Sequence, residues 1–135
     1  MTSDHTRPAV EATIDVPRPD GTAPTMVASA YRFGCWLIIE ADGEVDIAGV
    51  PLLRRLLDDD SSHVVFDLRR VTFIDACGLG LLAKTQQRVS RAHGAVRVAC
   101  PSQQARKLLK LTTLDQHITV VESLSQAFAG HDWCW

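Results

Sequence analysis

The sequence predicts one α/β domain with a mixed, mostly parallel sheet of about five strands and about four helices. Three observations lead to this prediction. From Val64 onward, short apolar segments alternate with amphipathic segments of helical period, the pattern of parallel β-α-β units. Before that point two strand-like segments are separated only by Gly34, which predicts an antiparallel hairpin. The chain has 135 residues, 46% of them hydrophobic, which suits one domain with a packed core.

The two ends of the chain are predicted to lie outside this domain. Residues 1–24 show no sustained period, and prolines interrupt them at positions 8, 17, 19 and 24. We therefore expect a flexible N-terminal tail over 1–24, the domain over 25–130 and a C-terminal tail over 131–135. Trp133 and Trp135 could anchor a partner, but a loosely packed end is the simpler interpretation.

The hairpin is expected from Met26–Phe33 and from the dense apolar segment Cys35–Ile39, with Asp42-Gly43 ending it. A helix is predicted over Val45–Leu57, because apolar residues recur there at three- and four-residue spacing. Asp46 is placed to be its N-cap. The three aspartates at 58–60 follow it, and we interpret them as a solvated loop rather than a metal site.

The second half of the chain supplies the parallel part of the sheet. Residues 63–68 form an apolar run suited to a central strand, and residues 71–74 continue it. A long helical pattern follows Asp75 and closes near His93-Gly94. Strands are expected over 95–100 and 117–121. Helices are expected from Pro101-Ser102, with Leu108, Leu109 and Leu111 on the buried side, and from Ser123, over Leu124, Ala127 and Phe128.

Composition argues against several functional classes. The formal net charge is -2, and basic pairs such as Arg54-Arg55 have acidic residues nearby, so no nucleic-acid partner is expected. No run of ~18 apolar residues predicts a membrane span, and the first residues lack the apolar part of a secretory signal, so we expect a cytoplasmic protein. The cysteines at 35, 77, 100 and 134 match no zinc spacing, so we expect no metal and no cofactor.

No catalytic motif is present either. The sequence contains no GxSxG and no GxxxxGK[ST], and Gly78-Leu79-Gly80 is too short for a dinucleotide fingerprint. We therefore expect an interaction module rather than an enzyme.

The strongest local feature is the segment from Phe73 to Gly80. An extended strand ends at Asp75, which is placed to cap the helix that begins within two residues. Gly78 and Gly80 each lower helix propensity by ~1 kcal/mol relative to alanine. Such a cost is better tolerated where a backbone must approach a partner closely. A tight strand-to-helix turn without function explains the same residues, and both interpretations remain open.

Three separated motifs in this chain resemble STAS domains of the bacterial anti-sigma factor antagonist type. They are VVFDL at 64–68 followed by VTFIDACGL at 71–79, GEVD at 43–46, and the segment 101–114. The likeness covers about residues 26–129. It implies an α/β fold with a mixed sheet and a role in partner switching. Such an antagonist binds an anti-sigma factor, itself a serine kinase, and so frees a sigma factor for transcription. The kinase phosphorylates a Ser or Thr directly after the loop aspartate, and a phosphatase reverses this.

This chain departs from the family pattern at the phosphoacceptor. Asp75 matches the loop aspartate, but Ala76 stands at the acceptor position and has no hydroxyl. The resemblance implies a partner surface that includes Asp46, the loop Asp75-Ala76-Cys77-Gly78, and Leu79. Our hypothesis is a constitutive binder that the kinase cannot switch off at this position. Asp46 and Asp75 could also serve only as helix caps.

Other hypotheses for this chain remain open. Cys77 near a helix N-terminus could be reactive, and Cys100 closes the next strand, so the two could form a redox switch. Two inert thiols are the alternative. A STAS scaffold, an accessory subunit of a lipid transporter and a small-ligand sensor are competing functions. No pattern in the sequence fixes an oligomeric state.

Overall fold

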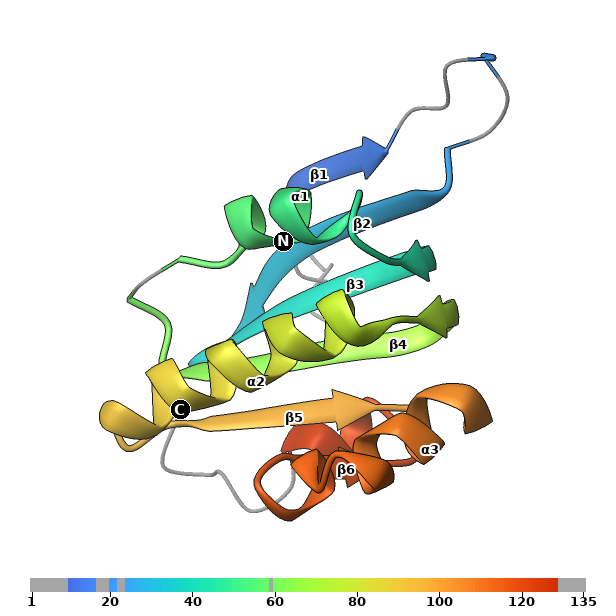
Figure 1. Cartoon of the computed structure of the whole chain (residues 1–135). Helices are drawn as coiled ribbons and strands as arrows, with labels where there is room; N and C mark the ends of the chain where they lie inside the picture. Colours follow the sequence, from blue (N-terminus) through green and yellow to red (C-terminus); the bar gives the residue numbers. More distant parts are fainter. Residues whose placement is uncertain (1–9, 17–19, 22–23, 59, 129–135) are drawn as a thin grey trace.

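A six-stranded sheet in the order β1-β2-β3-β4-β5-β6 forms the centre of the computed structural model, which describes residues 10–16, 20–21, 24–58 and 60–128 (Figure 1). In chain order the strands are β1 (Val10–Val16), β2 (Met26–Phe33), β3 (Trp36–Val45), β4 (His63–Ile74), β5 (Ala95–Ala99) and β6 (Thr119–Val121). β1, β2 and β3 pair antiparallel, and β3 to β6 pair parallel. The predicted mixed, mostly parallel sheet with a hairpin at its start is confirmed.

Three helices cover one face of this sheet: α1 (Val50–Leu56), α2 (Ala76–Arg91) and α3 (Gln103–Leu111). Two short 3-10 helices complete the described elements, η1 (Leu114–Gln116) and η2 (Ser125–Phe128). The last predicted helix is therefore only the short turn η2. It packs on the opposite face of the sheet through Ala127 and Phe128.

The strands divide their side chains between two cores, because neighbours in a strand point to opposite faces. On β4, Val64, Phe66 and Leu68 pack against the helices, whereas Val65 points to the other side. The smaller core on that side surrounds Trp36, which is fully buried.

The predicted N-terminal tail over 1–24 is wrong for residues 10–16, which form β1 and pair with β2. Apolar residues at 10, 12, 14 and 16 alternate with more polar ones, as expected of an edge strand. This short pattern lies between the prolines at 8 and 17, which by themselves indicate irregular chain. Ile14 packs against the main core. Residues 1–9 and the predicted C-terminal tail, 131–135, lie outside the described residues.

The first helix begins later than predicted. Val45 still belongs to β3, and α1 starts at Val50 with Gly49 as its N-cap and a proline in its first turn. Pro51 favours this start because proline is tolerated only where no intrahelical N–H is needed. Asp46 caps the turn before the helix: its carboxylate accepts hydrogen bonds from the N–H groups of Ala48 and Gly49, at 3.0 and 3.3 Å.

Two details of the later helices also differ from the sequence analysis. α2 ends near the predicted glycine, but His93 adopts the left-handed conformation (φ 58°). Gly94 is required for a different reason, since a Cβ there would lie 1.6 Å from the carbonyl oxygen of Ser62. In α3, Leu111 is 73% exposed rather than buried. It follows the buried Leu109 by two positions, which is about 200° around a helix.

Candidate functional site

The candidate site lies where β3 and β4 end side by side. Val45 and Ile74 are paired in the parallel register, and the N–H of Asp75 donates to the carbonyl of Val45 at 3.2 Å. The turn of Asp46 and the loop of Asp75 therefore leave the sheet at the same edge. The carboxyl ends of strands are the usual binding edge of α/β sheets.

Asp75 is the N-cap of α2, as predicted. Its Oδ1 accepts a hydrogen bond from the N–H of Gly78 at 3.0 Å, and its carbonyl accepts one from the N–H of Leu79 at 3.0 Å. Asp75 has an extended backbone, which is the usual conformation of an N-cap residue. The polypeptide therefore turns from strand to helix within one residue, and Ala76 and Cys77 are left exposed on the first turn.

Gln104 of α3 holds this loop from the other side, and the sequence analysis did not identify it. Its Nε2 donates to the carbonyl of Ile74 at 2.7 Å, and its Oε1 accepts from the N–H of Ile74 at 3.1 Å. The side-chain amide thus takes the place of a neighbouring strand beyond the end of β5. No local sequence pattern marks this contact, because 30 residues separate the two partners.

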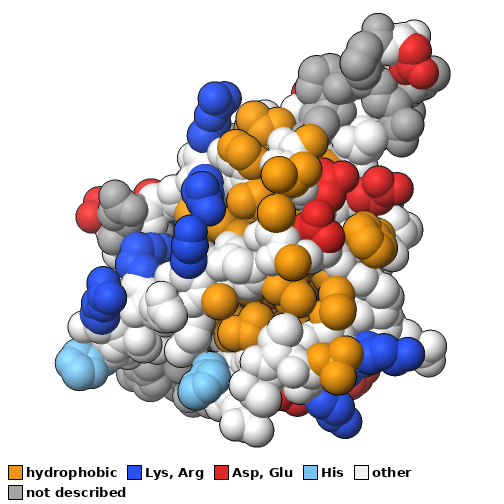
Figure 2. Space-filling view, in the orientation of Figure 1, with side chains coloured by type: hydrophobic (Ala, Val, Ile, Leu, Met, Phe, Trp, Pro, Cys, Tyr) orange, Lys and Arg blue, Asp and Glu red, His pale blue; other side chains and the backbone are white. Residues whose placement is uncertain are grey.

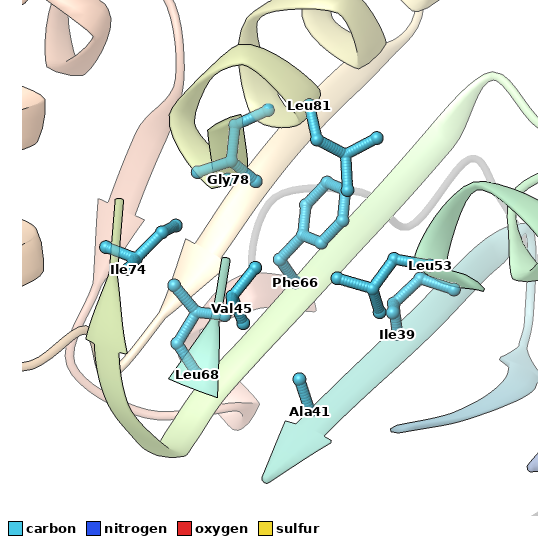
Figure 3. A pocket seen from close by; sticks show the side chains of 10 residues that line it. Ile39, Ala41, Val45, Leu53, Phe66, Leu68, Ile74, Gly78 and Leu81 are labelled. Atoms are coloured by element: carbon cyan, nitrogen blue, oxygen red, sulfur yellow. The ribbon is translucent and has the colours of Figure 1, made fainter. Parts of the chain in front are cut away.

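The two glycines of the loop segment have different surroundings. A Cβ on Gly78 would lie 2.5 Å from Cγ1 of Ile74 and 3.0 Å from Cγ1 of Val45, so the close packing of α2 requires glycine (Figure 3). A Cβ on Gly80 would meet no atom within 4 Å. The cavity beside Gly78 measures about 10 Å³ and has an apolar lining, so it holds no ligand.

Only some of the residues predicted for the partner surface are accessible to a partner. Gly78 and Leu79 are buried, whereas Asp46 and Asp75 are half-buried. Two large apolar residues beside these aspartates are accessible: Ile47 is 72% exposed and Phe73 is 44% exposed. Figure 2 shows hydrophobic and acidic side chains together near the ends of β3 and β4. Exposure of large apolar side chains next to a rigid loop is typical of a protein-binding surface.

Cys77 and Cys100 are both free thiols, and no disulfide joins them. Burial, followed by the carboxylate of Asp67, raises the pKa of the Cys100 thiol. Its Sγ also donates a hydrogen bond to the carbonyl of Glu122 at 2.8 Å. These surroundings disfavour the reactive thiolate at Cys100, and they give the redox hypothesis no support.

No group of three or more His, Cys, Asp or Glu side chains in the described part of the chain could hold a metal ion. None of the described helices combines the length and hydropathy needed to span a bilayer.

Comparison with solved structures shows the same fold in two anti-sigma factor antagonists. An anti-sigma factor antagonist from Mycobacterium paratuberculosis has a TM-score of 0.69 and 23% identity, over 84% of this chain and 96% of that one. The anti-sigma factor antagonist SpoIIAA of Bacillus, solved in unphosphorylated and phosphorylated forms, has in the former a TM-score of 0.65 and 18% identity, over 75% of this chain and 92% of that one.

A third similar structure comes from another class of protein. A sulfate transporter family protein from Wolinella succinogenes has a TM-score of 0.63 and 17% identity, over 74% of this chain and 87% of that one. A comparison with curated protein sequences finds no match. The STAS domain model matches residues 28–127, from β2 into η2. This chain therefore belongs to the STAS domain family.

Proposed function

We propose that this chain acts as an anti-sigma factor antagonist and binds an anti-sigma factor of the serine-kinase type. The observation that carries the proposal is the surface formed by Asp46, Ile47, Phe73 and Asp75-Ala76-Cys77, which we call the loop surface. Two segments that end neighbouring strands supply it, and Gln104 and the Asp75 cap hold it in place. A rigid surface with apolar side chains between carboxylates suits a partner with an apolar patch bordered by basic residues.

Ala76 makes the proposed complex insensitive to phosphorylation at this position. It is the first residue of α2 and is exposed, so a kinase could reach it, but alanine carries no hydroxyl. A phosphate there would add a charge of about −1.5 to −2 beside Asp75 and would alter the complex through that charge. Without that phosphate, the amount of complex depends only on the concentrations of the two proteins and on their affinity.

The test is a binding measurement with purified anti-sigma kinases from the same cell. Calorimetric titration of each kinase into the chain is expected to find at least one partner, with or without ATP. A variant with Asp46→Lys and Phe73→Ser should lose that binding, while its melting temperature should fall by only a few degrees, because Phe73 is exposed and the half-buried Asp46 caps only the short turn before α1. Asp60→Lys, at an exposed carboxylate before β4 and so at the opposite end of that strand from the loop surface, is the matched control. Failure of every kinase to bind would overturn the proposal.

A further inference from the structure

Gly80 is the residue of the loop segment that the fold leaves unexplained. Gly78 is required by its contacts with Ile74 and Val45, but a Cβ at position 80 would meet nothing within 4 Å. Gly80 lies inside the helix α2 and does not have a left-handed backbone. Since alanine forms helices better than glycine, the fold by itself favours alanine at this position. An atom outside the chain that approaches the helix backbone would account for the glycine.

Gly80 forms part of a groove between α2 and the segment after α3. The groove measures about 320 Å³ and is lined by Ala76, Leu79, Gly80, Ala83, Thr112 and Leu114. It continues into a second hollow of about 230 Å³, which shares Ala83 and Leu114 and reaches Ser90. From Ala76 to Ser90 is about 21 Å along a helix, at 1.5 Å per residue. We call the whole depression the α2 groove.

The α2 groove is continuous with the loop surface, since Ala76 belongs to both. The large exposed hydrophobic residues of the described chain are Ile47, Phe73 and Leu111. Ile47 and Phe73 border the loop, and Leu111 precedes Thr112 on the far wall of the groove. Figure 2 shows hydrophobic side chains gathered over this part of the helical face. An apolar area of this kind extends the surface that a single partner can cover.

A row of cations runs along the other side of α2. Lys84 and Arg91 are exposed, and the exposed Arg54 and Arg55 in the last turn of α1 continue the row. Arg88 lies between Lys84 and Arg91 on α2, but it is half-buried and donates a hydrogen bond to the carbonyl of Ser61 at 3.0 Å. Figure 2 shows a line of basic side chains beside the hydrophobic area. No acidic side chain of the described residues pairs with Lys84 or Arg91. The helix dipole favours cations in the last turn, which accounts for Arg88 and Arg91 but not for Lys84.

We infer that the α2 groove binds an amphipathic α-helix of the same partner, with apolar residues in the groove and acidic residues toward the row of cations. This inference rests on the proposed function. Three observations select a helix of this kind: the groove is about four turns long, glycine permits close approach of a backbone, and the flanking charge is positive. Helix-in-groove docking positions apolar side chains at three- and four-residue spacing in the same way.

The first test fills the groove at Gly80. Titration calorimetry with the kinase that binds the wild-type chain is expected to show binding to Gly80→Leu weakened by about tenfold or more, because a leucine would occupy the space of the helix. Gly80→Ala should weaken binding less and raise the melting temperature by about 2–4 °C. Gln103→Leu places the same side chain at an exposed position of α3 outside the groove, and it should bind as the wild type does.

The second test reverses the flanking charge. Lys84→Glu with Arg91→Glu should weaken binding about tenfold at low ionic strength, and the difference should shrink at high salt, because exposed charges are screened. Lys107→Glu, an exposed cation on α3, changes the net charge by half as much and lies outside the row, so it should have little effect. Sedimentation of the chain alone shows whether a second copy occupies the groove instead.

The outcomes separate the two proposals. Wild-type affinity in Gly80→Leu, with the kinase still bound, overturns this inference and leaves the proposed function intact. No kinase binding by the wild type overturns the proposed function and this inference with it. Self-association of the wild type that Gly80→Leu abolishes would also overturn it, because a second copy would then be the occupant. Loss of binding in Gly80→Leu together with a preserved or raised melting temperature supports it.

Discussion

The side-chain amide of Gln104 hydrogen-bonds to both backbone groups of Ile74: it donates to the carbonyl at 2.7 Å and accepts from the N–H at 3.1 Å. Ile74 is the last residue of β4, and it precedes the capping aspartate of α2. β5 ends too early to pair with this part of β4, since its register with β4 stops at Asp67 and Ala99. Gln104 therefore supplies the hydrogen bonds that a longer neighbouring strand would have made.

Gln104→Ala should lower the free energy of unfolding modestly and should increase local opening of the loop surface. The loss of both bonds leaves a part-buried backbone N–H and C=O without this partner, at a cost of about 1–3 kcal/mol. Urea unfolding measures that cost, and hydrogen exchange of the Ile74 and Asp75 amides should become faster, because Gln104 accepts from the first and holds the strand end beside the second. Gln103→Ala, one residue earlier and exposed, should change neither measurement. Unchanged exchange in Gln104→Ala would show that the Asp75 cap suffices to hold the loop.

The two glycines of α2 should respond in opposite directions to alanine. In Gly78→Ala the new methyl would lie 2.5 Å from Cγ1 of Ile74, and overpacking of this kind costs about 1–3 kcal/mol. Improved helix propensity offsets at most about 1 kcal/mol of it. Gly80→Ala has no such contact, so its free energy of unfolding should rise by up to about 1 kcal/mol. Equal effects in thermal unfolding would contradict the difference in packing.

Mild acid should destabilise the domain through His63. Burial, followed by the positive charge of Arg97, lowers the pKa of His63 below 6.5. The unfolded chain therefore binds a proton at a higher pH than the folded chain does, so the stability contributed by His63 is present above about pH 6.5 and is lost as the pH falls through the folded pKa. The ring lies edge-on to Trp36, with centroids 5.1 Å apart, so charging it also disturbs the smaller core.

Urea midpoints at pH 7.5 and pH 5.5 measure this dependence. The wild type should be less stable at the lower pH, and His63→Phe, which keeps an aromatic ring but cannot titrate, should lose much of the difference. His93→Asn is the control, because that histidine is exposed and asparagine tolerates its left-handed backbone. An identical pH dependence in His63→Phe would assign the effect to other groups.

The elements that the sequence predicted well are those with strong local signals. β4 is a continuous apolar run, and Asp75 stands directly before a long helical pattern, so strand, cap and helix were located together. β1 was missed because its alternation lasts only seven residues between prolines. The predicted start of α1 was too early because Asp46 caps a separate turn just before the helix. An aspartate that caps such a turn and one that caps the helix itself look the same in the sequence.

The candidate site was predicted in part, and the missing part depends on tertiary contacts. The family motif indicated the loop, and the Asp75 cap follows from residue type. Gln104 and Leu111 lie about 30 or more residues away from the loop along the chain. Their roles depend on how α3 packs, which no local period records. The different surroundings of Gly78 and Gly80 could be recognised only from the neighbouring atoms in the structure, because the two glycines look equivalent in the sequence.

Ala76→Ser should restore a switch to the loop. The new hydroxyl would stand at the exposed first position of α2, directly after the loop aspartate, where the family resemblance implies a phosphoacceptor. With the partner kinase and labelled ATP, this variant should incorporate phosphate and then lose affinity, because the phosphate adds a charge of about −1.5 to −2 close to Asp75. The serine itself should alter the free energy of unfolding by less than about 0.5 kcal/mol, since the position is exposed.

The matched control for this variant is Cys77→Ser, which places the same hydroxyl one residue later. It tests whether the kinase phosphorylates only a serine at position 76 or any serine in the loop. We expect label in Ala76→Ser and none in the wild type. Label in the wild-type chain, located on this loop by peptide mapping, would contradict the constitutive binding proposed for it. Label in Ala76→Ser without loss of affinity would show instead that the partner tolerates a phosphate beside Asp75, so that alanine at this position is not what keeps the complex intact.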